Sequence, residues 1–103
     1  AAKELLVAKN MPTAILCSSD FKALGAVRAF RENGLRVPED IAVMGYDGLS
    51  FPEEENLPLT TVRISKKEMV REGLDFLLKA SLNGTGYAVR KKIEPELIIG
   101  KTA

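Results

Sequence analysis

Polar side chains that could bind a ligand follow two apolar runs of the sequence. Ser19 and Asp20 come directly after the apolar run at residues 13–17, and Asp47 comes directly after the run at residues 41–46. A short continuous apolar run is typical of a parallel strand that is covered on both faces. Parallel sheets bind ligands at the carboxyl ends of their strands. We therefore expect these three side chains to lie along one edge of a sheet.

Each of these residues also has a structural interpretation. Asp20 directly precedes a predicted helix and, like Ser18 and Ser19, could serve as the N-cap of that helix. Asp47 precedes Gly48, and the Asp-Gly pair is common in turns that bind no ligand. From the residue pattern alone, both interpretations stay open.

Enzyme chemistry has little support in this sequence. The chain has no histidine, so the serines at residues 18 and 19 have no base nearby in sequence that could activate a nucleophile. The single cysteine, Cys17, lies inside an apolar run and is predicted to be an inert packing residue. Neither a metal-binding Cys/His cluster nor a phosphate loop is present, because the glycines at 84 and 86 follow a helix and not a strand. We expect no catalytic residue, no metal and no cofactor.

Composition and charge narrow the possible partners. The chain has 103 residues with 15 Lys and Arg against 14 Asp and Glu, which gives a net charge of +1 with both signs interspersed. Such a balance does not predict a surface that binds many phosphates, so we do not expect this chain to hold DNA by itself. No apolar run is long enough to cross a bilayer, and the opening residues lack the apolar stretch of a signal peptide. We expect no membrane partner and a cytoplasmic location.

Hydrophobic periodicity predicts alternating strands and helices. Strands are expected at residues 13–17, 41–46 and 59–64, and helices at residues 2–9, 21–33 and 66–83. This alternation is typical of βαβ units, so the predicted fold class is α/β, with a partial parallel sheet of three strands flanked by helices. One or two short strands are expected between residues 87 and 99, interrupted by Pro95.

Two helices carry faces that can be assigned from their spacing. In the helix at 21–33, Ala23, Ala26, Val27 and Phe30 should face the core, and Gly34 follows where a left-handed C-cap is expected. Phe21 and Leu24 lie about 100–160° round the helix from Ala23, so they form a second apolar patch for another packing layer or for a partner. The helix at 66–83 should start from a capping box of Ser65 and Glu68 and bury one face. That face consists of Met69, Gly73, Phe76, Leu77 and Ala80.

Five segments of the chain resemble the LacI/GalR family in order and spacing. They are Pro-Thr-Ala-Ile-Leu-Cys-Ser-Ser-Asp at 12–20, Ala-Leu-Gly-Ala at 23–26, Gly-Leu-Arg-Val-Pro-Glu-Asp-Ile at 34–41, Val-Met-Gly-Tyr-Asp at 43–47 and Pro-Leu-Thr-Thr-Val-Arg at 58–63. All five segments lie within residues 12–63 of the chain. The last segment favours regulators over the related periplasmic sugar-binding proteins.

This resemblance implies a two-lobed, periplasmic-binding-protein-like core that binds a small effector, typically a sugar, between its lobes. Residues 1–103 would be a single fragment of the effector-binding and dimerisation domain, from its C-terminal lobe, and the operator-binding helix-turn-helix domain would be absent. By likeness Asp47 is the effector-binding carboxylate, Ser19 stands where many members have a ligand-contacting asparagine, and Asp20 matches the family aspartate.

The resemblance also implies a homodimer or a higher oligomer. Phe21, Leu24 and Arg28 match the helix that packs across the dimer interface of such regulators. Two further strands would precede Pro12 in a complete lobe, so the strand at 13–17 should here leave an apolar edge that self-associates. The alternatives are the C-terminal lobe of a periplasmic sugar-binding protein of a transport system, and an enzyme or phosphorelay domain of flavodoxin-like fold.

Overall fold

A computed structural model describes residues 2–7, 10–49, 51, 58–83 and 90–103. The chain divides into two compact units, one formed by residues 1–63 and 96–103 and the other by residues 64–95. The predicted turn at 84–86, the start of the predicted C-terminal strands at 87–89 and the end of the first predicted helix at 8–9 lie outside the described residues.

The first unit is built on a four-stranded sheet. Its strands are β1 (Ala14–Leu16), β2 (Ala42–Asp47), β3 (Thr60–Arg63) and β4 (Glu96–Ile98), in the spatial order β1-β2-β3-β4. The first three strands are parallel and β4 runs antiparallel to β3. The unit also contains the helices α1 (Ala2–Leu6) and α2 (Asp20–Glu32). The predicted α/β class is confirmed, and the C-terminal segment contributes one strand.

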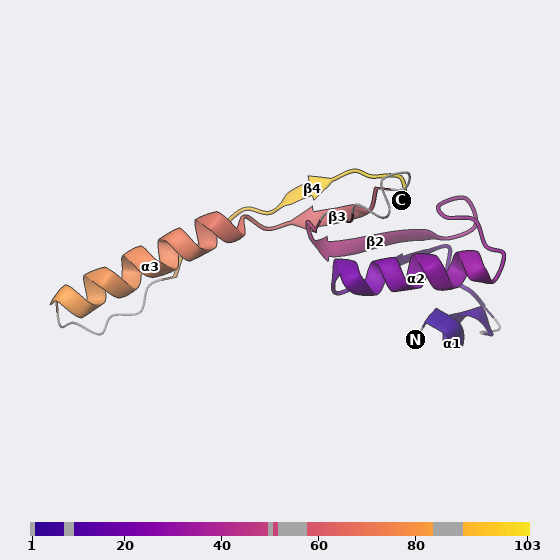
Figure 1. The fold of residues 1–103 in the computed structure, drawn as a ribbon, viewed down its shortest axis with the longest axis horizontal. Helices are drawn as coiled ribbons and strands as arrows, with labels where there is room; N and C mark the ends of the chain where they lie inside the picture. The colour runs from indigo at the N-terminus through magenta and orange to yellow at the C-terminus, as the bar shows by residue number, and fades with distance from the viewer. Residues whose placement is uncertain (1, 8–9, 50, 52–57, 84–89) are drawn as a thin grey trace. The chain divides into compact units, whose positions relative to one another are not determined.

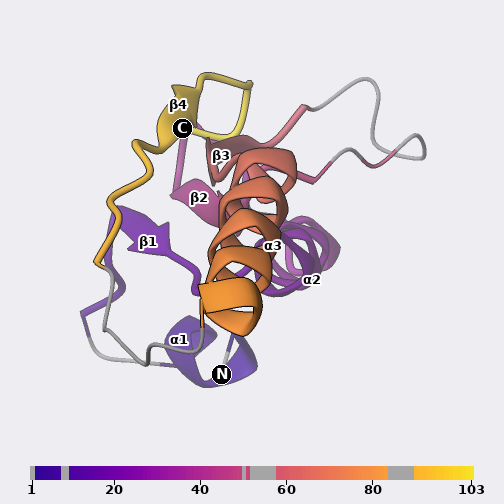
Figure 2. The ribbon, with the colours of Figure 1, turned by 90° about the vertical axis from the view of Figure 1, so that its left-hand side faces the viewer.

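The helix α2 lies alongside β2 and supplies most of the core (Figure 1). Ala23, Val27 and Phe30 are each no more than 2% exposed, and Ala26 is buried with them, as their spacing predicts. They pack with Val37, Ile41 and Val43, and α1 adds Leu5 and Leu6 at the margin. In Figure 2 the axis of α2 points towards the viewer, and the helix lies to one side of the strands.

Local hydrogen bonds set the ends of α2. The Ser19 Oγ accepts a 3.3 Å bond from the Lys22 amide, so Ser19 is the N-cap and Asp20 is the first helical residue. The capping interpretation of Asp20 is therefore wrong. At the other end Gly34 adopts a φ of 81°, which confirms the predicted left-handed position.

The sheet is covered less completely than its apolar strands suggested. Leu16 of β1 is 71% exposed and Tyr46 of β2 is 38% exposed. The expectation that the first strand is covered on both faces is wrong for this structure. A sheet covered on both faces needs a helix on each, and the connection from β2 to β3 contains no helix among its described residues.

The second unit contains the helix α3 (Lys66–Asn83). Its first turn is capped as predicted by Ser65, whose Oγ accepts a 3.3 Å bond from the Glu68 amide. The predicted burial of its apolar face is wrong, because Met69 is 52% and Leu77 is 62% exposed. Among its described residues this unit has no other helix or strand that could cover that face.

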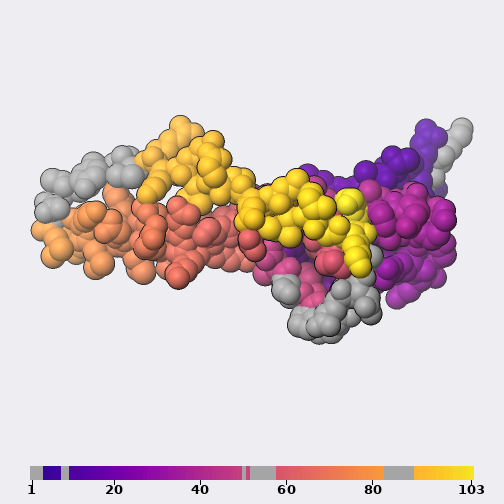
Figure 3. All heavy atoms as spheres, turned by 90° about the horizontal axis from the view of Figure 1, so that it is seen from above, coloured from indigo at the N-terminus to yellow at the C-terminus, as the bar shows by residue number. Residues whose placement is uncertain are grey.

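The C-terminal residues of the chain complete the first unit (Figure 3, yellow). Thr102 is 1% exposed; its carbonyl accepts a 2.6 Å bond from the Val43 amide, and its hydroxyl accepts a 2.9 Å bond from the Thr60 amide. The tail therefore pairs with both central strands close to their first residues. Of the helices that the structure describes, none has the length and hydropathy needed to cross a membrane.

Candidate functional site

Asp47 is the last residue of β2 and is partly buried. Its φ of 127° lies where residues other than glycine are rarely found, and Gly48 follows with a φ of 69°. Such a backbone conformation costs on the order of 1–3 kcal/mol and persists only where the surrounding structure holds it. The chain therefore holds Asp47 in a strained turn at the carboxyl end of a parallel strand, where open α/β sheets bind ligands.

Two buried polar side chains hold this turn. The Asp20 Oδ2 accepts a 2.6 Å bond from the Leu49 amide, and its Oδ1 accepts a 2.5 Å bond from the Thr61 hydroxyl. The same Thr61 oxygen accepts a 3.3 Å bond from the Gly48 amide. Asp20 is fully buried and Thr61 is 3% exposed. Both amides that follow Asp47 are thus bonded to side chains from other elements, and we call Asp20 and Thr61 the turn clamp.

Two glycines make room for this arrangement. Gly45 lies opposite Thr61 in the β2–β3 register, and a Cβ added to it would collide with the Asp20 carboxylate and come within 2.9 Å of Leu59. A Cβ added to Gly48 would lie 2.5 Å from the Arg63 Cβ. Glycine in a strand interior often marks such a close approach of another group. Replacement of either glycine would push against the turn clamp or the turn itself.

The predicted ligand-binding residues meet at one edge of the sheet, since Asp47 ends β2 and Ser19 and Asp20 follow its parallel neighbour β1. Their surroundings differ. No described residue donates a hydrogen bond to the Asp47 carboxylate, whereas the Ser19 oxygen caps α2 and both Asp20 oxygens accept bonds from the chain itself. Contact of each residue with a ligand stays a prediction, and Asp47 is the most available of the three.

Cys17 is close to this edge, but its environment does not activate it. Partial burial raises the pKa of the Cys17 thiol, and the positive charge of Lys22 opposes this only in part. The Lys22 ammonium donates a 2.9 Å bond to the Ser18 hydroxyl. A thiol whose pKa is raised stays protonated at neutral pH and is a poor nucleophile.

The residues predicted for the dimer interface lie on the outer side of α2. Phe21 is 70% exposed and Arg28 is exposed, while Leu24 is partly buried. The Phe21 ring meets the Phe51 ring edge to face, with 5.4 Å between ring centroids. The apolar patch therefore continues into the segment that follows Asp47.

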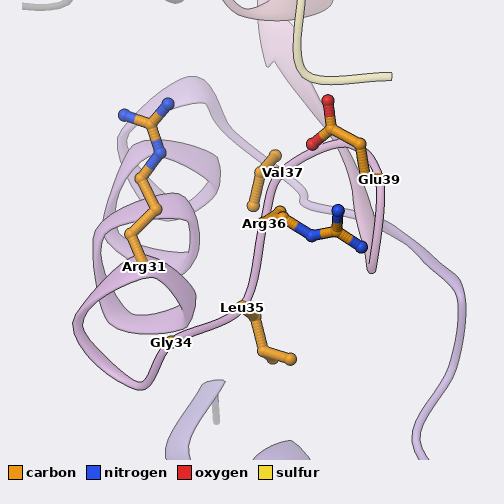
Figure 4. A pocket seen from close by; sticks show the side chains of 6 residues that line it. All are labelled: Arg31, Gly34, Leu35, Arg36, Val37 and Glu39. Atoms are coloured by element: carbon orange, nitrogen blue, oxygen red, sulfur yellow. The ribbon is translucent and has the colours of Figure 1, made fainter.

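A hollow of about 430 Å³ lies elsewhere in the first unit. It is lined by Arg31, Gly34, Leu35, Arg36, Val37 and Glu39, and Figure 4 shows how these side chains lie. These residues precede β2, so the hollow is at the opposite end of that strand from Asp47. Arg36 is already paired with Asp40, which it contacts at 2.6 Å. The hollow therefore has no part in the Asp47 site.

Sequence reasoning missed Thr61 and Gly45. The pattern at residues 59–64 predicts a strand but no role for Thr61, although a threonine on a buried strand needs a hydrogen-bond partner and so signals a polar contact. Gly45 interrupts an apolar strand, which could have indicated the close approach of another group. Within the described residues, no three His, Cys, Asp or Glu side chains gather closely enough to hold a metal ion.

Comparison with known proteins gives consistent matches over the chain. A family model described as a periplasmic binding protein-like domain matches residues 1–103. The chain is 41% identical over 101 residues to a protein of Haemophilus influenzae named HTH-type transcriptional repressor PurR, which covers 95% of this chain and 30% of that repressor. The chain thus spans about a third of the length of the curated relatives it matches.

Solved structures show the same fold. The crystal structure of the lac repressor dimer bound to operator and the anti-inducer ONPF matches with a TM-score of 0.86 and 35% identity, covering 98% of this chain and 35% of that one. The complex of the transcriptional regulator CelR with cellobiose matches with a TM-score of 0.81 and 34% identity, covering 88% of this chain and 28% of that one.

Proposed function

The chain belongs to the periplasmic binding protein-like domain family as it occurs in LacI/GalR transcriptional regulators, and from this premise we propose that it senses an effector and forms dimers within a longer regulator. The relatives are named as repressors, which favours a regulator over a transport receptor. The function we propose involves no catalysis, and a regulator of this kind works in the cytoplasm.

The effector we propose is a small molecule rich in hydrogen-bond donors, and a sugar is the best candidate. The single observation that carries this proposal is the strained turn that holds Asp47 at the carboxyl end of β2. A carboxylate has two oxygens that accept hydrogen bonds, so it can bind two neighbouring hydroxyl groups or the edge of a base. The match to a regulator complex that contains cellobiose supports a sugar.

Ser19 is the second proposed contact. Its hydroxyl can donate to an effector oxygen while its oxygen keeps the Lys22 amide bonded. Asp20 is less suited to direct contact, because it is fully buried and both of its oxygens are occupied. We propose that Asp20 affects effector binding indirectly, through its hydrogen bonds to the turn that carries Asp47.

Partners other than the effector follow from the same family membership. We propose that Phe21, Leu24 and Arg28 of α2 contact a second copy of the protein, since Phe21 is exposed on the outer side of that helix. Operator DNA is bound by a separate helix-turn-helix domain in the proposed regulator, because the net charge of +1 gives this chain little attraction for phosphates.

The proposal is tested by replacing Asp47 in the full-length protein. Operator binding is followed by fluorescence anisotropy while glucose, sucrose or cellobiose is added, the sugars bound in the similar solved structures. The expected result is that Asp47→Ala abolishes the response to the molecule that moves the wild-type protein on or off the operator, while operator affinity without that molecule stays within about twofold. An unchanged response would remove Asp47 from the site and with it the proposed effector contact.

A further inference from the structure

The turn that carries Asp47 is held by side chains from two other elements, and this has a consequence for effector binding. We propose that Asp20 and Thr61 are positioning residues that hold residues 47–49 in the one conformation that presents the Asp47 carboxylate to the effector. This inference rests on the proposed function of Asp47. Neither residue is proposed to touch the effector.

The hydrogen bonds of the turn clamp run in one consistent direction. Asp20 can only accept from the Leu49 amide and from the Thr61 hydroxyl, which lie 2.6 and 2.5 Å from its two oxygens. The Thr61 hydroxyl has a single proton and gives it to Asp20, so its oxygen is left to accept from the Gly48 amide at 3.3 Å. Asp20 thus orients the Thr61 hydroxyl, and Thr61 in turn binds the Gly48 amide. Both amides after Asp47 are therefore bonded.

Burial makes these bonds hard to replace. Asp20 is fully buried and Thr61 is 3% exposed, so water has little access to either side chain. A buried polar group that loses its partner cannot recover the bond from solvent. Gly45 leaves the space that the Asp20 carboxylate occupies, because a Cβ on that residue would collide with it. The carboxylate is therefore held by its two donors, and any side chain at residue 45 would displace it.

The turn needs such support because its backbone is strained. Asp47 has a φ of 127°, and a released turn would relax towards the negative φ values that non-glycine residues favour. That rotation would swing the Asp47 side chain away from its present direction. A carboxylate that binds two hydroxyl groups at once depends on direction, so the relaxed turn would bind a sugar less tightly.

Exchange of backbone amide hydrogens tests the clamp without any effector. In the full-length protein, Thr61→Val keeps the shape of the side chain and removes the hydroxyl, while Thr61→Ser keeps the hydroxyl. We expect exchange at Gly48 and Leu49 to be roughly tenfold faster in the valine variant, as for the loss of one buried hydrogen bond, and within about threefold of wild type in the serine variant. Wild-type exchange at both amides in Thr61→Val would overturn the proposal.

Sugar binding supplies the functional arm of the test. Asp20→Asn and Thr61→Val are compared with the control variant Asp40→Asn. The Asp40 carboxylate also accepts a bond from a loop amide, that of Arg36, but it lies at the other end of β2. We expect affinity for the responsive sugar of the panel to fall at least about tenfold in the first two and to be unchanged in Asp40→Asn, with operator affinity without sugar unchanged in all three. Thr61→Ser should restore most of the affinity.

The two proposals fail in different ways. If Asp47→Ala abolishes the sugar response while Thr61→Val binds sugar as wild type does, the positioning role is overturned and the site stands. If Asp47→Ala leaves the response intact, or if no molecule of the panel changes operator binding, the proposed effector contact is overturned. The exchange rates alone then decide whether the turn clamp holds the turn.

Discussion

The backbone amide of Leu49 donates a 2.6 Å hydrogen bond to the carboxylate of Asp20, a residue 29 positions earlier in the chain. This bond ties the segment after β2 to the first turn of α2. Two residues beyond Leu49, the Phe51 ring packs against Phe21 of the same helix. The segment that carries Asp47 and the helix that carries the proposed dimer surface are therefore attached at two places.

Replacement of Gly48 should be more damaging than replacement of Gly34, although both have a positive φ. Gly34→Ala places its Cβ in open space and should cost about 1 kcal/mol from backbone strain alone. Gly48→Ala adds a collision with the Arg63 side chain and should cost roughly a further 1–3 kcal/mol. Urea unfolding of the two variants gives both free energies, and equal values would mean that the Arg63 contact yields at no cost.

The two phenylalanines of α2 should behave differently when truncated. Phe30 is fully buried, so Phe30→Ala should destabilise the fold by about 3–5 kcal/mol. Phe21 is 70% exposed, so Phe21→Ala should cost about 1 kcal/mol, most of it from the lost contact with Phe51. Thermal unfolding separates these cases. A large loss of stability in Phe21→Ala would show that Phe21 packs inside the unit and is not available to a partner.

The chain should self-associate through the edge of its sheet. β1 stands at the end of the strand order and Leu16 is 71% exposed on it, which leaves an apolar strand edge open to pairing. Light scattering at micromolar concentration should give a dimer or a larger species, and Leu16→Lys should shift the distribution towards monomer. A monomeric wild-type chain would contradict this expectation.

The Asp40 carboxyl should titrate far below its usual range. Hydrogen bonds from the Arg36 guanidinium and amide lower the pKa of Asp40 to about 2. Because the folded pKa is below the unfolded value of about 3.9, the pair adds stability above that value and loses it as the pH falls towards 2. NMR titration of the carboxyl carbon measures this directly, and Arg36→Ala should return the pKa towards its ordinary value. A pKa near 4 in the wild-type chain would mean that the pair does not form in solution.

Prediction from sequence succeeded where a feature depends on nearby residues. The core face of α2 and the left-handed Gly34 follow from spacing and from local backbone chemistry, and both were confirmed. The shared position of Ser19, Asp20 and Asp47 at the carboxyl ends of β1 and β2 was also predicted, because parallel strands place their carboxyl ends together.

Prediction failed where the outcome depends on what packs from a distance. The partners of Asp20 come from positions 49 and 61, and no spacing rule connects them to residue 20. The apolar face of α3 has the period of a buried helix, but a period states only that a face can be buried and cannot supply the surface that covers it. Leu16 of β1 is exposed for the same reason, because an apolar run does not reveal whether a helix covers each face of the sheet.

The bond between Thr102 and the start of the sheet bears on how the protein is synthesised. Thr60 and its partner are separated by 42 positions, and the ribosome makes Thr102 after every strand of the sheet has been translated. A nascent chain therefore exposes unpaired strand amides until translation of this region ends, and in that interval it can be bound by chaperones or cut by proteases. A chain that stops before residue 101 would leave this gap permanently open, so such a truncated product should be degraded even though its Asp47 turn is intact.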